Sequence, residues 1–464
     1  MRSLIKSVTN GKRVLILGYG REGRSSLKFI RESCPGLPLV VADANPDLLA
    51  QHPELLQEGI TAITGPDYLQ EIDRADLVIK SPGISLQKSG SRIDPSRITS
   101  QTDLFLRAYS AQVAGITGTK GKSTTASLLY HIMQAYSPNV LFAGNIGIPL
   151  FNLIPDINTG TRIVCELSSH QLEYINRGPH IAVLLNLFQE HLDHYPSFYD
   201  YQMAKLQAGL KQSEADYFIF TAADENTSAL LKQHALRSRL LPVYPSAFSG
   251  NGIGNSGPDV VLRMGSAERA LLPAGFKTRL AGIHNQINIR VAAAAAALMQ
   301  IPAAVTEQAV ASFSPLEHRI EFVGTFNGKR FYNDSISTIP EATIAAVNTI
   351  GQVHTLILGG FDRGIDYAVL TDFLASLKGT KLVFTGPAGG RMLKELSLNR
   401  ASAGQAIYFA DFTEAVKAAI ELTPEGGSCL LSPAAASYDS FTNFEERGRY
   451  FRELVSEKKS SLSG

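Results

Sequence analysis

The sequence predicts an α/β protein with three domains, and two observations support this fold class. Three segments repeat one pattern, in which a short β-branched run leads into a turn of small residues and then into a helical pattern. Such alternation is typical of parallel sheets covered by helices. The length of 464 residues suggests about three domains, at ~150 residues each. We expect the domains to span residues 1–108, 109–315 and 316–464.

The predicted strands of each segment end in small or polar residues. In chain order they are RVLILGYG (13–20), PLVVAD (38–43) and DLVIKSPG (76–83); then QVAGITG (112–118), RIVCELSS (162–169), HIAVLLNLF (180–188) and DYFIFTAAD (216–224); then KRFYNDS (329–335), HTLILGG (354–360), KLVFTGPAGG (381–390) and SCLLSPAAAS (428–437). Open α/β sheets bind ligands beyond the carboxyl ends of their strands. We therefore expect the binding sites at these turns.

Two features suggest where the second domain gives way to the third. The stretch FSGNGIGNSGP (248–258) is dense in Gly, Asn and Ser, so we expect it to form neither helix nor strand. The run RVAAAAAALM (290–299) predicts a helix that ends before Pro302.

Composition and charge favour an ordinary folded protein of a reducing compartment. The net charge of +1 gives no electrostatic reason to expect nucleic acid or an anionic membrane as a partner. The three cysteines are dispersed and form no C-x-x-C pair, which argues against a disulfide framework or a zinc site. The N-terminus lacks the apolar core of a signal peptide, and no window approaches the ~20 apolar residues of a membrane span. We expect a cytoplasmic monomer.

The first segment carries the motif Gly18-Tyr-Gly-Arg-Glu-Gly23 between a predicted strand and a predicted helix, and Asp43 follows the motif by 20 residues. This is the fingerprint of dinucleotide-binding domains, in which backbone N–H groups and a helix N-terminus meet a diphosphate. Taken alone, it predicts a nicotinamide-dependent oxidoreductase. Any nucleotide diphosphate would suit the same geometry, including a nucleotide sugar, and glycines that serve only close strand–helix packing are the alternative.

The second segment carries GITGTKGKSTT (115–125), which departs from the usual phosphate-binding loop. The strict pattern is G-x-x-x-x-G-K-[ST], and Ile116 stands where its first glycine belongs. Gly118 and Gly121 still allow successive backbone N–H groups to converge on phosphate oxygens, and the helix dipole adds to the attraction.

Three side chains near this loop fit the chemistry of a nucleoside triphosphate. Lys122 would reach the terminal phosphates, and the Ser123 hydroxyl would sit on Mg²⁺. Glu166 ends the apolar strand RIVC, where its carboxylate could reach the same ion. A helix entry that contains Gly-Lys-Ser by chance, and an acid that only caps the next element, are the alternatives.

At these motifs the chain resembles the Mur ligase family, whose ATP loop reads G-T-x-G-K-[ST]. Further matching stretches follow in order: CELSSHQLE (165–173), NLFQEHLDHYPSFYDYQMAKL (186–206), GIHNQIN (282–288), LEHRIEFV (316–323), FYNDS (331–335) and SPAAASYDSFTNFEERG (432–448). Members that add glutamate to UDP-N-acetylmuramoyl-L-alanine fit best. The resemblance implies a Rossmann-like first domain that binds the UDP substrate, a central P-loop ATPase-type domain that binds ATP, and a Rossmann-like third domain that binds glutamate.

The resemblance also implies a reaction, in which the substrate carboxylate attacks the γ-phosphate of ATP and the amine of glutamate then displaces phosphate from the acyl phosphate. The implied ATP-binding residues are Gly118, Thr119, Lys120, Gly121, Lys122, Ser123, Thr124, Asn285, Arg319 and Asp334. Catalysis is implied for Lys122, Glu166, His191 and Lys205, and contact with two Mg²⁺ ions for Ser123, Glu166, His191 and Lys205. Lys205 is implied to carry a carbamate formed with CO₂.

Family positions further imply both substrate sites. The UDP substrate is expected at Gly20, Arg21, Glu22, Asp43, Ser81, Pro82, Gly83, Asn145 and His191, and glutamate at Thr338, Arg363, Ser437, Tyr438 and Phe444. Two positions depart from many members, because Arg363 replaces a lysine and Ile336 replaces the lysine of N-D-S-K. The second change removes a cation from the amino-acid site. We expect D-glutamate as the substrate. Because of these two changes, we keep L-glutamate as the alternative.

Three other functions fit parts of the sequence. An NAD(P)-dependent oxidoreductase would leave the loop at 115–125, Glu166 and the block 186–206 without a role. A folylpolyglutamate synthase shares a version of the loop and also adds glutamate, but the UDP-type first domain counts against it. A nucleotide-binding protein without catalysis would not need the combination of Lys122 with Glu166, His191 and Lys205.

Overall fold

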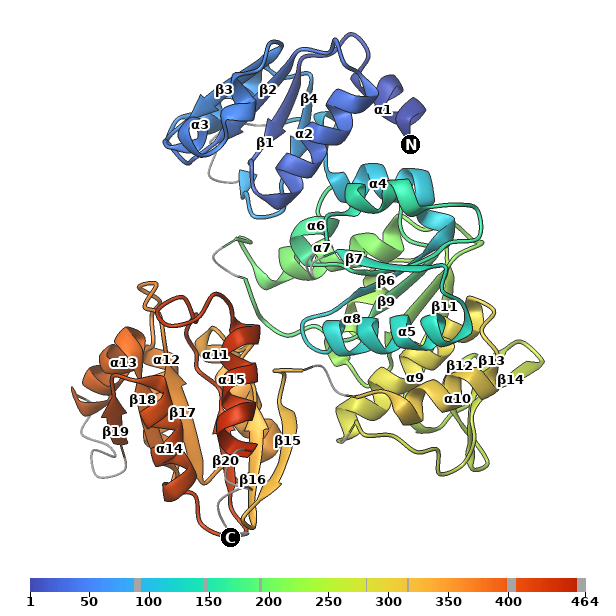
Figure 1. Cartoon of the computed structure of the whole chain (residues 1–464). Coiled ribbons are helices and arrows are strands. Elements are labelled where there is room, and N and C mark those ends of the chain that lie inside the picture. Colours follow the sequence, from blue (N-terminus) through green and yellow to red (C-terminus); the bar gives the residue numbers. More distant parts are fainter. Residues whose placement is uncertain are drawn as a thin grey trace. The chain divides into compact units, whose positions relative to one another are not determined.

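A computed structural model describes residues 1–86, 93–144, 148–191, 194–280, 282–314, 317–398 and 406–456. The chain divides into two compact units, Met1–Ser314 and Pro315–Gly464. The first unit contains two β-sheets and the second unit one, each packed with helices (Figure 1). The predicted α/β fold class is confirmed. A domain boundary at residue 108 stays a prediction, because both sheets of the first unit belong to one compact body.

The first sheet has five parallel strands in the order β3-β2-β1-β4-β5. The strands are β1 (Val14–Leu17), β2 (Leu39–Asp43), β3 (Ile60–Thr64), β4 (Leu77–Lys80) and β5 (Ile98–Thr99). The helices are α1 (Arg2–Thr9), α2 (Arg21–Ser33), α3 (Leu48–Gln51), α4 (Gln101–Tyr109) and the 3₁₀ helices η1 (Pro53–Leu56), η2 (Tyr68–Arg74) and η4 (Pro95–Arg97). The strand order reverses at β1, and such a switch point opens a crevice at the carboxyl end of the strands. The glycine motif lies there, because α2 begins directly after it.

The second sheet has nine strands in the order β14-β13-β12-β11-β10-β9-β6-β8-β7. The strands are β6 (Val113–Thr117), β7 (Val140–Gly144), β8 (Arg162–Glu166), β9 (Ile181–Leu184), β10 (Tyr217–Thr221), β11 (Arg239–Ala247), β12 (Gly252–Ser256), β13 (Asp259–Met264) and β14 (Ala267–Leu272). The helices are η5 (Ser110–Gln112), α5 (Lys122–Tyr136), η6 (Leu150–Asp156), α6 (Ser169–Leu172), α7 (Phe198–Leu210), α8 (Glu225–Gln233), α9 (Ile283–Leu298) and α10 (Ala303–Ser312). Strands β12, β13 and β14 pair antiparallel, and the other pairs are parallel.

Strand β12 corrects the expectation that residues 248–258 form neither helix nor strand. A Cβ on Gly252 would lie 2.6 Å from the carbonyl oxygen of Pro242, and one on Gly254 would lie 2.7 Å from that of Ser246. Glycine here permits close approach to the neighbouring strand β11, so the composition that suggested a loop belongs to a tightly packed strand.

The helix predicted at 290–299 is confirmed as part of α9. Ala292–Ala296 are all buried, and their small side chains let α9 pack closely against α5. In the sheet, every residue of β6 is buried, as expected for a parallel strand covered on both faces. None of the described helices combines the length and apolar character needed to cross a membrane.

The second unit contains six strands in the order β15-β16-β20-β17-β18-β19. The strands are β15 (Glu321–Phe326), β16 (Lys329–Asn333), β17 (Thr355–Gly359), β18 (Lys381–Thr385), β19 (Ala406–Phe409) and β20 (Ser428–Leu431). The helices are α11 (Pro340–Ile350), α12 (Ala368–Ser376), α13 (Gly386–Leu398), α14 (Phe412–Leu422) and α15 (Phe444–Ser456). Of these strands, only β15 runs antiparallel to its neighbour.

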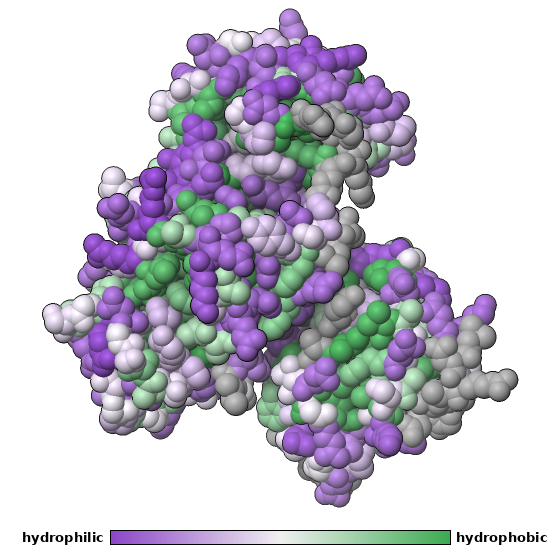
Figure 2. All heavy atoms as spheres, turned by 180° about the vertical axis from the view of Figure 1, so that it is seen from behind, coloured by the Kyte–Doolittle hydropathy of each residue, from purple (hydrophilic) through white to green (hydrophobic). Residues whose placement is uncertain are grey.

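Hydrophilic residues dominate the surface around the first sheet, at the top of Figure 2, which fits a sheet whose apolar strands are buried.

Candidate active site

The phosphate loop joins β6 to α5, and its glycines are required by its conformation. Gly118 has a φ of +144° and Gly121 a φ of +85°, which side chains other than hydrogen rarely allow. A Cβ on Gly118 would lie 2.9 Å from Leu185 Cβ, and one on Gly121 would lie 3.0 Å from Asn288 Oδ1. The loop is therefore pressed against the segment after β9 and against α9, which bring neighbouring parts of the predicted site to it.

Asn186 fixes the backbone of the loop by two hydrogen bonds. Its backbone oxygen accepts a hydrogen bond from Thr119 N at 2.9 Å, and its side-chain oxygen accepts one from Lys120 N at 2.8 Å. The Thr119 hydroxyl accepts from Phe188 N at 2.9 Å and lies 3.0 Å from the Tyr201 hydroxyl. Two of these bonds occupy the N–H groups of Thr119 and Lys120. The first N–H groups of α5 have no acceptor within the helix, so they are donors that a phosphate can use.

Two lysines and two hydroxyl groups predicted for ATP lie in the loop and in the first turn of α5. Lys122 Nζ donates to the carbonyl oxygens of Gly118 and Thr119, at 2.8 Å each, and therefore lies over the loop. Ser123 and Thr124 follow in the first turn of α5. Lys120 forms an ion pair with Glu190 across the mouth of the loop.

Glu166 and Lys205 lie at the same carboxyl edge of the sheet. Glu166 ends β8 beside Ile116 of β6 and is 2% exposed. Lys205, on α7, is also 2% exposed, and its Nζ lies 3.5 Å from the hydroxyl of Thr117, the last residue of β6. The structure thus brings together the phosphate loop, an acid and a lysine that are far apart in the sequence.

The groups at this edge fit a hard cation that is bound partly by protein oxygens and partly by the phosphates of a nucleotide. Within the described part of the chain, no three His, Cys, Asp or Glu side chains gather as a metal site. The Ser123 hydroxyl and the Glu166 carboxylate are oxygen donors of the kind Mg²⁺ prefers, and Mg²⁺ usually takes its remaining ligands from phosphates and water.

Lys205 has an unusual environment for a lysine. Burial, followed by the charge of Lys122, lowers its pKa well below the ordinary value, and Glu190 and Glu166 oppose the shift. Its Nζ lies 4.8 Å from the centre of the Tyr201 ring, and no carboxylate of the described residues lies within ion-pair distance. The amine is therefore held closer to its neutral, nucleophilic form.

His191 follows β9 with a φ of +58°, a strained backbone for a residue other than glycine. Its side chain is exposed, and its ring centre lies 4.9 Å from that of His170 and 5.9 Å from that of Tyr201. Burial, with the charges of the neighbouring histidines, lowers the pKa of His170 to about 4. The predicted catalytic His191 is thus placed beside α7, which carries Lys205.

Asn285 lies in the first turn of α9, near the loop. Its Oδ1 accepts a hydrogen bond from Asn288 Nδ2 at 3.1 Å, and the Asn288 side chain also abuts Gly121. The stretch HNQIN therefore contributes to the surroundings of the phosphate loop through Asn288, which was not among the predicted residues.

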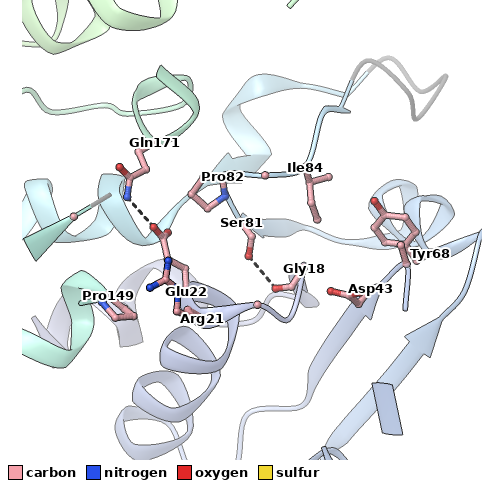
Figure 3. A pocket seen from close by; sticks show the side chains of 14 residues that line it. Gly18, Arg21, Glu22, Asp43, Tyr68, Ser81, Pro82, Ile84, Pro149 and Gln171 are labelled. Atoms are coloured by element: carbon pink, nitrogen blue, oxygen red, sulfur yellow. Dashed lines mark hydrogen bonds between the residues drawn. The ribbon is translucent and has the colours of Figure 1, made fainter. Parts of the chain in front are cut away.

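A pocket of about 380 Å³ opens at the carboxyl edge of the first sheet (Figure 3). It is lined by Gly18, Gly20, Arg21, Glu22, Asp43, Ala44, Tyr68, Ser81, Pro82, Gly83, Ile84, Gly144, Pro149 and Gln171. The structure brings together the predicted substrate residues of the first domain, and it adds Gln171, Gly144 and Pro149 from elements of the second sheet. Asn145 lies outside the described residues.

The floor of this pocket is built by backbone contacts. A Cβ on Gly23 would lie 2.0 Å from the carbonyl oxygen of Gly18, so α2 packs directly on the turn. The Ser81 hydroxyl donates to the same oxygen at 2.9 Å. Asp43 accepts hydrogen bonds from Tyr19 N at 2.7 Å and from Asn45 N at 2.9 Å, and each carboxylate oxygen retains a lone pair that a ribose hydroxyl could use.

A buried charged network below the pocket was not predicted from the sequence. Lys80 Nζ donates to Glu173 Oε2 at 2.8 Å and to the Pro82 carbonyl oxygen at 3.3 Å, and His194 Nε2 lies 2.6 Å from Glu173 Oε1. Burial alone would raise the pKa of Glu173, but hydrogen bonds from His194 and Lys80 and the charge of Lys80 bring it below its usual value. The one signal in the sequence is a lysine at the end of the apolar strand LVIK.

In the second unit, Asp334 is buried and held by several donors. The Ser432 hydroxyl donates to its Oδ2 at 2.7 Å, and Ile320 N donates to its Oδ1 at 3.1 Å. Burial raises the pKa of Asp334 to about 6, although these hydrogen bonds and the charge of Arg319 lower it. Arg319 is partly exposed, so its guanidinium is accessible to a ligand.

Of the residues predicted for glutamate, Thr338, Arg363, Ser437 and Tyr438 lie on loops that follow strands of the third sheet, and Phe444 begins α15. Arg363 donates from Nη2 to the carbonyl oxygen of Thr338 at 3.0 Å, and the exposed Tyr438 ring meets Phe361 edge-on at 6.2 Å. Ser437 is buried, and the Phe444 carbonyl oxygen accepts from Ser335 Oγ at 2.8 Å.

Arg447 joins these loops and was missed by sequence reasoning. It is 1% exposed, and it donates from Nη2 to the carbonyl oxygens of Ser335 at 2.9 Å and Ala435 at 3.0 Å, and from Nη1 to that of Ala436 at 3.1 Å. Burial lowers its pKa to about 10. An arginine in the amphipathic stretch NFEERGRYF looks like a solvated charge, so no local pattern marks it.

Comparisons with known proteins show the family of the chain. The family model of the Mur ligase middle domain matches residues 116–296. A UDP-N-acetylmuramoylalanine–D-glutamate ligase of Symbiobacterium thermophilum is 35% identical over 409 residues, which cover 87% of this chain and 88% of that protein. The enzyme of the same name from Koribacter versatilis is 33% identical over 453 residues, 96% of this chain and 97% of that protein.

Solved structures show the same fold at low identity. MurF from Acinetobacter baumannii matches with a TM-score of 0.56 at 15% identity, and the match covers 98% of each chain. The MurF ligase of Thermotoga maritima, solved in complex with ADP, matches with a TM-score of 0.54 at 14% identity, over 99% of this chain and 100% of that one. The chain therefore belongs to the Mur ligase family, among the UDP-N-acetylmuramoylalanine–D-glutamate ligases.

Proposed function

We propose that the protein joins the amine of D-glutamate to the alanyl carboxylate of UDP-N-acetylmuramoyl-L-alanine, converting ATP to ADP and phosphate. The observation that carries this proposal is the meeting of the phosphate loop, Glu166 and the buried Lys205 at one sheet edge, in the same unit as a pocket suited to a nucleotide diphosphate. The names of relatives at 31–35% identity support the choice of substrates.

The chain's own groups account for the main needs of such a reaction. The first N–H groups of α5 and the Lys122 ammonium neutralise the terminal phosphates of ATP. Magnesium, bound through Ser123 and Glu166, would supply further positive charge to the transferred phosphoryl group. The exposed His191 is proposed to orient the acyl group that receives the phosphoryl.

We further propose that Lys205 is carbamoylated and that a second magnesium ion uses the product. The neutral amine attacks CO₂, an N–C bond forms, and the nitrogen loses a proton, which leaves a carboxylate on the side chain. A buried lysine with a lowered pKa is suited to this reaction, because only the unprotonated amine is nucleophilic. The carbamate would also convert an unfavourable buried cation into an anion beside the cations of the loop.

The finer features of its setting are proposals as well. The three free cysteines and the use of ATP and a UDP-linked substrate support a cytoplasmic location. We propose a monomer that acts on small molecules only, without nucleic acid or membrane partners.

L-glutamate is a second candidate, and one observation favours it. Ile336 occupies the place where many relatives have a lysine, and its backbone N–H is bonded to the His318 carbonyl oxygen at 3.1 Å. The amino-acid site thus lacks one cation, and Arg363 supplies a forked guanidinium in place of a compact ammonium. Such changes would alter where the two carboxylates of glutamate are held, and the stereochemistry accepted depends on those positions.

Phosphate release measured with ATP and UDP-N-acetylmuramoyl-L-alanine tests the proposal, with D- and L-glutamate offered in parallel. Release with D-glutamate supports the main proposal, and a preference for L-glutamate supports the second candidate. Release with neither enantiomer contradicts both. The same assay with a folate in place of the UDP substrate tests a folylpolyglutamate synthase. Titration with NAD(H) tests an oxidoreductase. The Lys122→Ala variant is the negative control for phosphate release.

A further inference from the structure

The substrate pocket contains a buried carboxyl group whose second oxygen has no hydrogen-bond partner. Glu22 is the second residue of α2, and its Oε1 accepts a hydrogen bond from Gln171 Nε2 at 2.8 Å. Its Oε2 is buried, and it has no partner within the described part of the chain. Leaving a carboxylate oxygen in this state is unfavourable, so the arrangement calls for a donor from a bound ligand.

Glu22 occupies one end of the pocket. Figure 3 shows it beside Gln171 and near Pro149, which belong to the second sheet's part of the unit, whereas Asp43 and Tyr68 lie at the opposite end. The glycine turn, where a diphosphate meets the start of α2, lies between these ends. A nucleoside placed at Asp43 therefore directs the rest of its molecule past Glu22.

The carboxyl of Glu22 lies at the helix N-terminus where a diphosphate would bind. Burial raises the pKa of Glu22, and the hydrogen bond from Gln171 and the charges of Lys80 and Arg21 oppose that shift. In its ionised form this carboxyl would repel a diphosphate, unless the ligand also brought an N–H or O–H group to it.

We propose that Glu22 Oε2 accepts a hydrogen bond from a hydroxyl or amide group on the sugar–peptide portion of the UDP substrate, and that Glu22 thereby discriminates against UDP alone. This inference rests on the proposed function and deepens it. A site built around such a bond rejects analogues that lack the donor, because the buried acceptor is then left unpaired. Free UDP would leave Oε2 unpaired and place it beside negative charge.

The neighbouring capping box makes Glu22→Gln an informative variant. Gln171 Oε1 accepts from Ser168 N at 3.1 Å, so the amide of Gln171 cannot flip without losing this bond, and its Nε2 must face residue 22. A glutamine at position 22 then has to turn its own oxygen toward Gln171. Its NH₂ group would replace Oε2 and would meet the substrate's donor with another donor.

Calorimetric titration of UDP-N-acetylmuramoyl-L-alanine and of UDP into the full-length protein tests the inference. In Glu22→Gln, the affinity for the UDP-sugar substrate should fall about tenfold or more, as expected for loss of a hydrogen bond to a charged group, while the affinity for UDP should stay equal or rise. Glu32→Gln, an exposed change of the same charge on the same helix, should alter neither. Glu22→Asp, which keeps the charge but withdraws it, should weaken the UDP-sugar substrate without strengthening UDP.

Two results would overturn the inference. Tighter binding of both ligands to Glu22→Gln would mean that Glu22 only repels phosphate, and equal weakening of both would mean that it only maintains the pocket. A wild-type protein that fails to bind UDP-N-acetylmuramoyl-L-alanine would contradict the proposed function itself. That outcome is visible before any variant is measured.

Discussion

The charge of Asp334 should lower the free energy of unfolding of the second unit at neutral pH. Its pKa rises from 3.8 to about 6 in the folded protein, so folding favours the protonated carboxyl. The resulting stabilisation is fully present below pH 3.8 and is lost as the pH rises through about 6. A rise of about two units corresponds to about 3 kcal/mol, at ~1.4 kcal/mol per unit.

The variant Asp334→Asn removes the charge and can keep the hydrogen bonds. Its Oδ1 can accept from Ile320 N as before, and its Nδ2 can donate to the Ser432 hydroxyl, whose proton can then turn to Thr343 Oγ1 at 3.0 Å. The free energy of unfolding of the second unit should therefore increase by about 3 kcal/mol at pH 8 and by about half as much at pH 5. Turnover should fall, because a neutral amide replaces a carboxylate predicted to act on ATP.

Urea unfolding of the full-length protein at both pH values, with hydrogen exchange of peptides from β16 and β20 to report the second unit, measures the effect. Glu421→Gln, an exposed change on α14, is the matched control and should shift neither value. The reasoning fails if Asp334→Asn is no more stable than the wild type at pH 8. It also fails if the gain is the same at pH 5, because then the charge is not its source.

Three further predictions concern the first unit. Lys205→Ala should lose most ligase activity and regain part of it with an added short-chain carboxylate, and full activity without rescue would exclude a carbamate. Gly118→Ala adds a Cβ 2.9 Å from Leu185 Cβ at a φ of +144°, so the affinity for ATP should fall about tenfold or more in equilibrium binding, whereas Gly257→Ala, where no atom lies within 4 Å, should leave it unchanged. Glu173→Leu leaves the buried Lys80 without its partner and should destabilise the protein by about 3–5 kcal/mol in urea unfolding, and Lys80→Met in the same chain should recover part of this loss; purely additive effects would show that the pair is not coupled.

Local sequence patterns predicted the elements that carry the site, and the structure shows why they sufficed. The phosphate loop and the glycine turn are set by residues next to one another in the chain, because φ values such as those of Gly118 and Gly121 exclude other side chains. The helix α9 was likewise predicted from neighbouring residues alone, because its alanines follow one another in the chain. Patterns failed at Gly252–Ser256, where glycines serve contact with β11, a partner that the sequence does not reveal.

Contacts between distant segments lay beyond such patterns. Glu22 contacts Gln171, which is 149 positions away in the sequence. Lys80 contacts Glu173, which is 93 positions away. No periodicity encodes these pairings, since they depend on how two sheets are packed. The only local hint was a charged side chain in an apolar or glycine-rich setting, as in LVIK and GREG.

Buried charged groups of this chain differ in how many hydrogen-bond partners the fold gives them. Asp103 is fully buried, and it accepts hydrogen bonds from Thr99 Oγ1, Asn176 N and Asn176 Nδ2 at 2.6 to 3.3 Å. Arg447 is equally buried, and it donates to carbonyl oxygens from both of its terminal nitrogens. Such groups are satisfied by the fold itself, so nothing in their surroundings requires a ligand.

Glu22 and Lys205 are the contrasting cases. Glu22 has one oxygen bonded and one buried without a described partner, and Lys205 has a hydroxyl at 3.5 Å and the face of a tyrosine ring. A fold under selection for stability alone would replace such side chains with apolar ones, because an incompletely paired buried charge is unfavourable. Their presence at the carboxyl edges of the first two sheets therefore requires another source of stabilisation. A bound substrate can supply it to Glu22 and a covalent carboxylate to Lys205, so incomplete pairing points to the chemistry more directly than burial does.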